Sequence, residues 1–139
     1  MGHWVAETDP SGAALAGVVR VGGAPEGFDA RLVLDEVARQ NAPVIHIARD
    51  DKRLQSMSDA LAFLGPDIPV LRFPGWDCLP YDRVSPNADI AASRMATLAA
   101  LTHGAPSRFI LLTTLNAVTQ RVPGQDVLRN AAFSARVGF

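Results

Sequence analysis

The amino-acid sequence predicts an α/β fold in which a parallel sheet is covered by helices on both faces, giving three layers. Short β-branched runs alternate along the chain with stretches whose apolar residues recur at helical spacing. This alternation is typical of right-handed βαβ units, which place a helix over the sheet between successive parallel strands. Two of the runs are almost continuously apolar, as in strands that are buried on both faces. We therefore expect one domain around a parallel sheet.

The composition is that of an ordinary globular protein and excludes several other classes. The 139 residues are 48% hydrophobic and 19% charged, and the net charge of -1 argues against a strongly basic surface for nucleic acid. The single cysteine, Cys78, excludes a disulfide framework and a thiolate metal cage. No apolar run approaches the ~18 residues of a membrane span, and the start of the chain lacks a signal-peptide pattern. We expect a soluble, cytoplasmic protein with no membrane partner.

The first half of the chain contains two predicted strands and two predicted helices. A β-branched run predicts a strand over Gly17–Val21, after a small and polar leader. Apolar residues at helical spacing predict a helix over Phe28–Gln40, which ends before Pro43. The run Val44–Ala48 predicts the next strand. A stripe of apolar residues then predicts a helix over Asp50–Leu64, with an aspartate as its N-cap.

The second half repeats this alternation and then departs from it. Two further strands and two further helices are expected, over Val70–Phe73, Phe109–Thr113, Asp89–Leu101 and Leu115–Arg121. After Pro123 the rhythm changes, and the expected elements are a helical turn at Val127–Ala131 and a strand-like run at Phe133–Val137. Such a change is expected where a second structural unit begins. We interpret the sequence as a piece of a longer protein.

A glycine-containing loop between the first strand and the first helix occupies the place of a phosphate-binding loop. Such a loop needs the pattern G-x-x-x-x-G-K-[ST], because the glycines expose backbone N–H groups, the lysine meets the phosphate charge and the hydroxyl holds magnesium. Aligned from Gly23, the second glycine is replaced by Phe28, the lysine by Asp29 and the hydroxyl residue by Ala30. Gly27 remains, but we expect Asp29 to cap the helix instead of a phosphate. The loop therefore predicts no nucleotide, no cofactor and no catalysis.

A segment rich in aromatic residues and proline, from Phe73 to Asp89, follows the third predicted strand. Prolines exclude helix and central strand there, and the carboxyl edge of a parallel sheet is where α/β folds keep their sites. One interpretation is an ordered loop whose aromatic side chains cap the core. The other is a binding site: the helix N-terminus after Gly27 and the loop Trp76–Tyr81 would hold an anionic small molecule or a single nucleic-acid strand.

Charged residues in and beside this segment suggest how the loop is held. Three acids and two arginines could form a network that anchors it, namely Asp77, Asp82, Asp89, Arg83 and Arg94. The alternative is solvated surface charge, worth ~0–1 kcal/mol per pair. The other chemically interesting residues predict neither a catalytic nor a metal site. His46 lies in a buried-looking strand without metal-ligand spacing, and Cys78 has no histidine partner nearby in sequence.

Two sequence blocks resemble a known family. The first comprises Phe73, Trp76, Asp77, Leu79, Pro80, Tyr81 and Asp82, then Ser85, Pro86, Asp89 and Ile90, then Ser93, Arg94, Thr97 and Leu98. The second is the continuous run Leu112–Pro123. In order and spacing they are similar to the N-terminal region of the transcription-repair-coupling factors, the Mfd family, over about Val18 to Phe139.

The resemblance implies a fold and a role. This region of the family is similar to domain 1a of UvrB, a RecA-like α/β domain, which would span residues 14–123. Residues 1–13 would then be a flexible leader, and residues 124–139 the start of an inserted domain 2, which carries the family's UvrA-recruiting surface. UvrB has an intact phosphate loop, whereas Gly23–Ala30 here departs from it, as does the loop of the family.

The implied function is that of a non-catalytic scaffold in a repair protein. The family couples the removal of stalled RNA polymerase to nucleotide excision repair, and its RNA-polymerase-binding module and its motor, which uses ATP and magnesium to translocate on double-stranded DNA, lie downstream. The signature loop would be structural or would face a partner, another domain of the parent protein included. Its residues are Trp76, Asp77, Leu79, Pro80, Tyr81, Asp82, Pro86, Asp89 and Arg94.

Overall fold

A computed structural model describes residues 6–7, 20–78 and 85–131 of the chain. Its strands are β1 (Ala6–Glu7), β2 (Arg20–Val21), β3 (Val44–Ala48), β4 (Val70–Phe73) and β5 (Ile110–Thr114). Its helices are α1 (Phe28–Gln40), α2 (Asp51–Leu64), α3 (Ala88–His103), α4 (Leu115–Thr119) and α5 (Gln125–Ala131). The expected α/β alternation is thus confirmed from α1 to α4.

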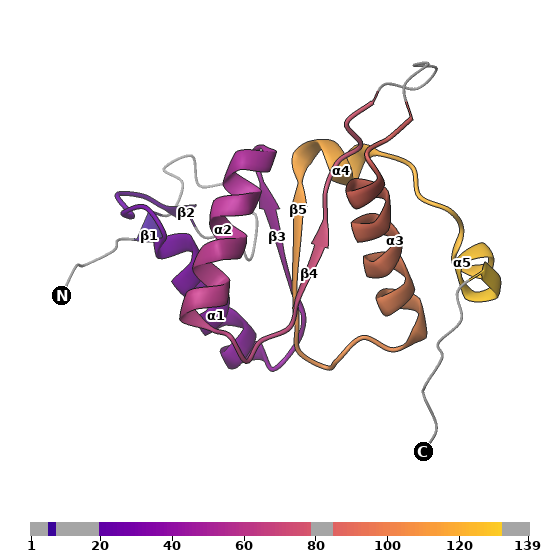
Figure 1. Ribbon diagram of the computed structural model, residues 1–139. Helices are drawn as coiled ribbons and strands as arrows, with labels where there is room; N and C mark the ends of the chain where they lie inside the picture. Colours follow the sequence, from indigo (N-terminus) through magenta and orange to yellow (C-terminus); the bar gives the residue numbers. More distant parts are fainter. Residues whose placement is uncertain (1–5, 8–19, 79–84, 132–139) are drawn as a thin grey trace.

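The three longer strands form a parallel sheet in the order β3-β5-β4. Figure 1 shows α1 and α2 on one side of this sheet and α3 on the other, which confirms the three-layer arrangement. The strand order explains the placement. A right-handed crossover from β3 to β4 puts α2 on one face, and the return from β4 to β5 runs in the opposite direction, so α3 must lie on the other face.

The first predicted strand does not join the parallel sheet. β2 pairs in antiparallel fashion with β1 as a separate two-stranded sheet, with Ala6 opposite Val21. The prediction of a parallel strand over Gly17–Val21 was therefore wrong, and residues 17–19 lie outside the described residues. Val21, where this run ends, is exposed. The leader expected at residues 1–13 contributes β1, and its other residues lie outside the described ranges.

The strand β3 was expected to be buried on both faces, and this was wrong. Ile45 is 62% exposed and Ile47 is 52% exposed, whereas Ala48 is buried. The physical reason is the position of the strand. β3 is at the edge of the sheet and is covered by α1 and α2 on one face, while α3 packs over β4 on the other face. The central strand β5 has the expected burial.

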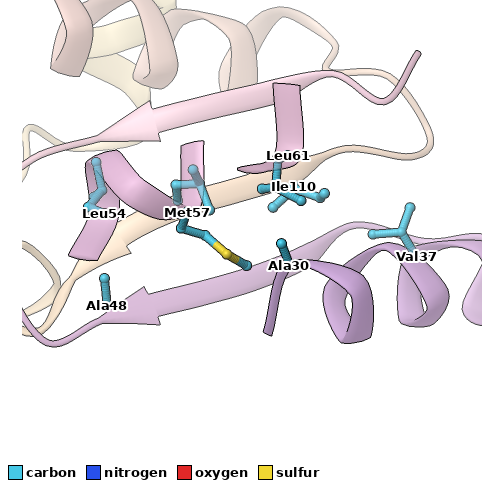
Figure 2. Close-up of a cluster of buried hydrophobic side chains, with 8 residues drawn as sticks. Ala30, Val37, Ala48, Leu54, Met57, Leu61 and Ile110 are labelled. Atoms are coloured by element: carbon cyan, nitrogen blue, oxygen red, sulfur yellow. The ribbon is translucent and has the colours of Figure 1, made fainter. Parts of the chain in front are cut away.

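The hydrophobic core lies between the sheet and the helices α1 and α2. Figure 2 shows its side chains converging from both helices and from the strands β3 and β5. Its buried members are Ala30, Val37, Ala48, Leu54, Met57, Leu61, Ile110 and Leu112. Gly65 ends α2 in close contact with α1: a Cβ at this position would lie 2.5 Å from Cδ2 of Leu34, so the Leu34 side chain would have to shift.

Several helix ends differ from the expected ones. The backbone N–H of Arg53 donates to the Asp50 carboxylate, which confirms the aspartate N-cap of α2. α3 begins after Asn87 and extends to His103, and α4 ends at Thr119 instead of Arg121. α5 is longer than the expected turn and contacts α3. The expected run Phe133–Val137 lies outside the described residues, and the domain boundary at residue 124 stays a prediction.

Candidate functional site

The carboxyl edge of the sheet contains a buried arginine between two aromatic rings. Arg94 of α3 is 2% exposed, and its guanidinium carbon lies 4.1 Å from the centre of the Phe73 ring and 4.5 Å from that of the Trp76 ring. Its Nη1 donates to the carbonyl oxygen of Pro74 at 2.6 Å. Stacking on aromatic faces favours the cation, whereas burial lowers the pKa of Arg94. The residue fastens α3 to the chain leaving β4.

Gln120, the residue after α4, joins this cluster. Its Oε1 accepts a hydrogen bond from Arg94 Nη1 at 3.2 Å and another from the backbone N–H of Trp76 at 3.0 Å. Gly75 allows the chain after β4 to pass close to α4, because a Cβ at this position would lie 3.2 Å from Nδ2 of Asn116. Sequence reasoning did not single out Gln120, although it lies inside the second motif block, Leu112–Pro123.

The described members of the predicted network, Asp77, Asp89 and Arg94, bind other partners than one another. Within the described part of the chain, Arg94 binds the carbonyl of Pro74 and the amide of Gln120 instead of a carboxylate. The Asp77 carboxylate accepts from the backbone N–H of Asn87 at 3.2 Å, and the Asn87 side chain accepts from the N–H of Asp89 at 2.9 Å. The expected ion pairs of Arg94 with Asp77 and Asp89 were wrong, because both aspartates are exposed while Arg94 is buried. The part of the network that involves Asp82 and Arg83 lies outside the described residues and stays a prediction.

The other members of the signature loop are only partly described. Pro86 is exposed beside the start of α3. Its members Leu79, Pro80, Tyr81 and Asp82 lie outside the described residues, as does Arg83 of the predicted charge network. The structure thus brings Trp76 and Arg94 together, sets Asp77 against Asn87, and leaves a structural or partner-facing role of the loop as a prediction.

The amino end of α1 is surrounded by acidic groups. Arg53 of α2 pairs with Glu26 and, at 3.6 Å, with Asp29. These residues line a cavity of about 180 Å³ together with Gly27, Ser56, Met57 and Ala60. These ion pairs are partly exposed and add little stability. With two carboxylates and one guanidinium, however, the net charge at the start of α1 is negative. Two carboxylates outnumber the one guanidinium at the position where phosphates would need positive charge.

Asp29 does not cap α1 in the expected way. The N-cap residue is Gly27, with a φ of 83°, and it has no side chain to cap the helix. Asp29 lies in the first turn and accepts a hydrogen bond from the backbone N–H of Ala30 at 3.0 Å. The N-cap assignment was therefore wrong, because the helix begins two residues earlier than that assignment requires. The carboxylate nevertheless satisfies one of the free N–H groups at the helix start.

His46 lies on the face of β3 that is covered by α1 and α2. Burial lowers its pKa below the ordinary value of 6.5, with Asp29 raising and Arg53 lowering the pKa to smaller extents. The folded chain therefore binds this proton more weakly than the unfolded chain does, so stability is lost as the pH falls below about 6.5 and through the native pKa. We expect His46→Gln to flatten this part of the pH profile.

The test is urea unfolding of both proteins between about pH 7.5 and 5.5. The difference between wild type and His46→Gln isolates this side chain from the other groups that titrate. An identical pH dependence in the two proteins would contradict the assignment.

The described residues hold no cluster of three or more histidine, cysteine, aspartate or glutamate side chains that could bind a metal ion. Within the same ranges, the helices are too short or too polar to cross a membrane.

Comparison with known proteins gives one consistent name. The transcription-repair-coupling factor of Escherichia coli is 32% identical over 124 residues, which are 88% of this chain. The factors of Rickettsia bellii and Rickettsia prowazekii are 31% and 29% identical over 80 residues, or 58% of this chain. The chain belongs to the transcription-repair-coupling factor family. No protein-family model and no solved structure match it.

The chain is short beside its relatives in this family. It spans 10% of the length of the Escherichia coli factor and 7% of each Rickettsia factor. The similarity therefore assigns a segment, and the activity of a whole transcription-repair-coupling factor is carried over only as a proposal.

Proposed function

We propose that this chain is a non-catalytic scaffold within a transcription-repair-coupling factor. Its α/β fold would be that of a RecA-like domain, similar to domain 1a of UvrB, that no longer binds or hydrolyses a nucleotide. Within the parent protein it would support the recruitment of UvrA by an adjacent domain. ATP and magnesium would act in the downstream motor, and RNA polymerase and double-stranded DNA would contact other domains, in the cytoplasm.

One observation carries this proposal: Arg53 is already paired with Glu26 and Asp29 at the start of α1. A phosphate there would need free N–H groups and an unpaired cation. The only arginine lining this cavity within the described residues is held by two acids, and Asp29 uses the N–H of Ala30. The residues present therefore do not fit a nucleotide, and we derive no catalytic step through one.

We expect isothermal titration with Mg·ATP or Mg·ADP to show no binding up to the millimolar range. The double variant Glu26→Gln and Asp29→Asn removes both carboxylates and frees Arg53. We expect this variant to gain measurable affinity for inorganic phosphate, because the guanidinium and the helix N-terminus would then face the anion together. Micromolar nucleotide binding by the wild type would overturn the scaffold assignment.

If this chain only supports UvrA recruitment, the surface that binds UvrA lies in another part of the factor. We expect UvrA to be retained by the full-length factor in a pull-down and not by the 139-residue chain alone. Tight binding of UvrA to the isolated chain would assign the contact surface to this segment and contradict a purely supporting role.

The alternative is a module that binds an anion or single-stranded nucleic acid, and the structure favours it less. One face of the Trp76 ring is covered by Arg94, whose Nη1 donates to Pro74 and Gln120. That face of the ring is closed to a base, and the guanidinium is buried away from any phosphate at the surface. A mobility shift with single-stranded DNA separates the two functions, since tight and steeply salt-dependent binding would favour the alternative.

A further inference from the structure

The strand β4 is an edge of the parallel sheet, and two of its residues direct their backbone groups outward. Among the described residues β4 pairs only with β5. The N–H of Ile110 in β5 donates to the carbonyl oxygen of Pro69 at 2.9 Å, so Pro69 faces β5. Because successive residues of a strand direct their N–H and C=O groups to alternate sides, Leu71 also faces β5, whereas Val70 and Arg72 face away from it. An edge of this kind can pair with a strand of another molecule.

Two hydroxyl groups of α3 occupy the outward carbonyl oxygen of Arg72. Thr97 Oγ1 donates to this oxygen at 2.6 Å, and Ser93 Oγ donates to it at 3.2 Å. A threonine within a helix commonly donates to the carbonyl four residues earlier in its own helix, as Thr102 does to Leu98 at 2.9 Å. Thr97 is 3% exposed and reaches the strand instead. A carbonyl oxygen has two lone pairs, so this acceptor has no place left for the N–H of an incoming strand.

The same edge carries two further obstacles to pairing. Pro74, just after β4, has no N–H to donate, and its carbonyl oxygen accepts from Arg94 Nη1 at 2.6 Å. The Arg72 side chain reaches α2, where its Nη2 donates to Gln55 Oε1 at 2.9 Å. Its Nε is buried and has no hydrogen-bond partner among the described residues. An inward-pointing charge and a proline are both devices by which edge strands avoid pairing with other chains.

We propose that the motif Ser93-Arg94-x-x-Thr97 of α3 closes the outer edge of β4 against strand addition by other molecules. Its three side chains donate to two carbonyl oxygens of the chain they cover, those of Arg72 and Pro74. They satisfy these acceptors as a neighbouring strand would, but they present no new strand edge to a further molecule. The inference concerns contacts between α3 and the chain of β4 alone, so it can fail or hold independently of the proposed scaffold function.

Sedimentation velocity and amide hydrogen exchange on the 139-residue chain test this proposal. The double variant Ser93→Ala with Thr97→Val removes both hydroxyls and leaves the carbonyl oxygen of Arg72 open. We expect it to self-associate about tenfold more tightly than the wild type, because the freed acceptor regains a donor by pairing with a second chain. In the associated form the outward amides of Val70 and Arg72 should exchange about tenfold more slowly. The amide of Leu71, which faces β5, is the internal control and should be protected in both proteins.

Control variants separate strand pairing from the aggregation of unfolded chains. Thr97→Ser keeps a hydroxyl near the carbonyl, and Thr102→Val removes one that bonds within α3, so both should associate like the wild type. Ser93→Ala removes only the longer bond at a partly exposed position, and we expect it to fold and to tighten association about threefold.

Three outcomes would overturn the proposal. The first is association of Ser93→Ala and of the double variant that is no tighter than that of the wild type; if the double variant does not fold, Ser93→Ala decides alone. The second is association that leaves the amides of Val70 and Arg72 exchanging as fast as in the wild type. The third is association of Thr102→Val as tight as that of the double variant.

Discussion

Replacing Arg94 with alanine is expected to lower the free energy of unfolding by about 3 kcal/mol. The change removes charge-assisted hydrogen bonds to Pro74 and Gln120, and it empties the space between the rings of Phe73 and Trp76. The carbonyl of Pro74 would lose a strong donor. Urea unfolding of the 139-residue chain, followed by tryptophan fluorescence and circular dichroism, measures the loss.

Two control variants separate the contributions of Arg94. Arg94→Lys keeps the charge but loses the planar stack and the fork of donors, so we expect it to recover only part of the lost stability. Arg31→Ala removes an exposed arginine that pairs with Asp35 on the surface, and should cost no more than about 0.5 kcal/mol. An Arg94→Ala protein as stable as Arg31→Ala would show that the buried cluster does not anchor α3.

Replacing Leu61 with alanine is expected to cost about 3 kcal/mol through a different mechanism. Leu61 is fully buried between α2 and the sheet, so truncation loses apolar burial and leaves a cavity beside Ile110 and Val37. The matched control is Phe63→Ala on the same helix. Phe63 is 85% exposed, and its removal should change stability by less than about 0.5 kcal/mol. Equal losses at both positions would contradict the orientation of α2.

Local patterns in the sequence predicted most of the helices and strands, because the interactions that start and end these elements act between residues close in sequence. Phe28–Gln40 was predicted with its observed bounds because its apolar spacing and the proline after it act within a few residues. The Asp50 cap likewise depends on one side chain and one nearby N–H group. The error at Gly17–Val21 arose because periodicity cannot tell which sheet a short run joins.

The candidate site was predictable in position but not in contacts. The aromatic and proline-rich segment does follow β4 at the carboxyl edge of the sheet. Arg94 binds Gln120 and the carbonyl of Pro74, however, and these partners are separated from it by 26 and 20 residues. Backbone carbonyls carry no sequence signal, so charge patterning favoured aspartates that lie at the surface. The exposed face of β3 was missed because an apolar run does not report how many neighbours a given piece of chain supplies.

Gln120 also determines how mechanical force would travel through the molecule. One carboxamide oxygen accepts from both the Trp76 backbone and Arg94, and it lies one residue beyond α4. Tension on the chain where it leaves α4 would therefore load the loop after β4 and the helix α3 at once. If this oxygen is displaced, the hydrogen bonds from the Trp76 N–H and from Arg94 Nη1 break together. Force from neighbouring polypeptide would then disrupt the aromatic cluster in one step.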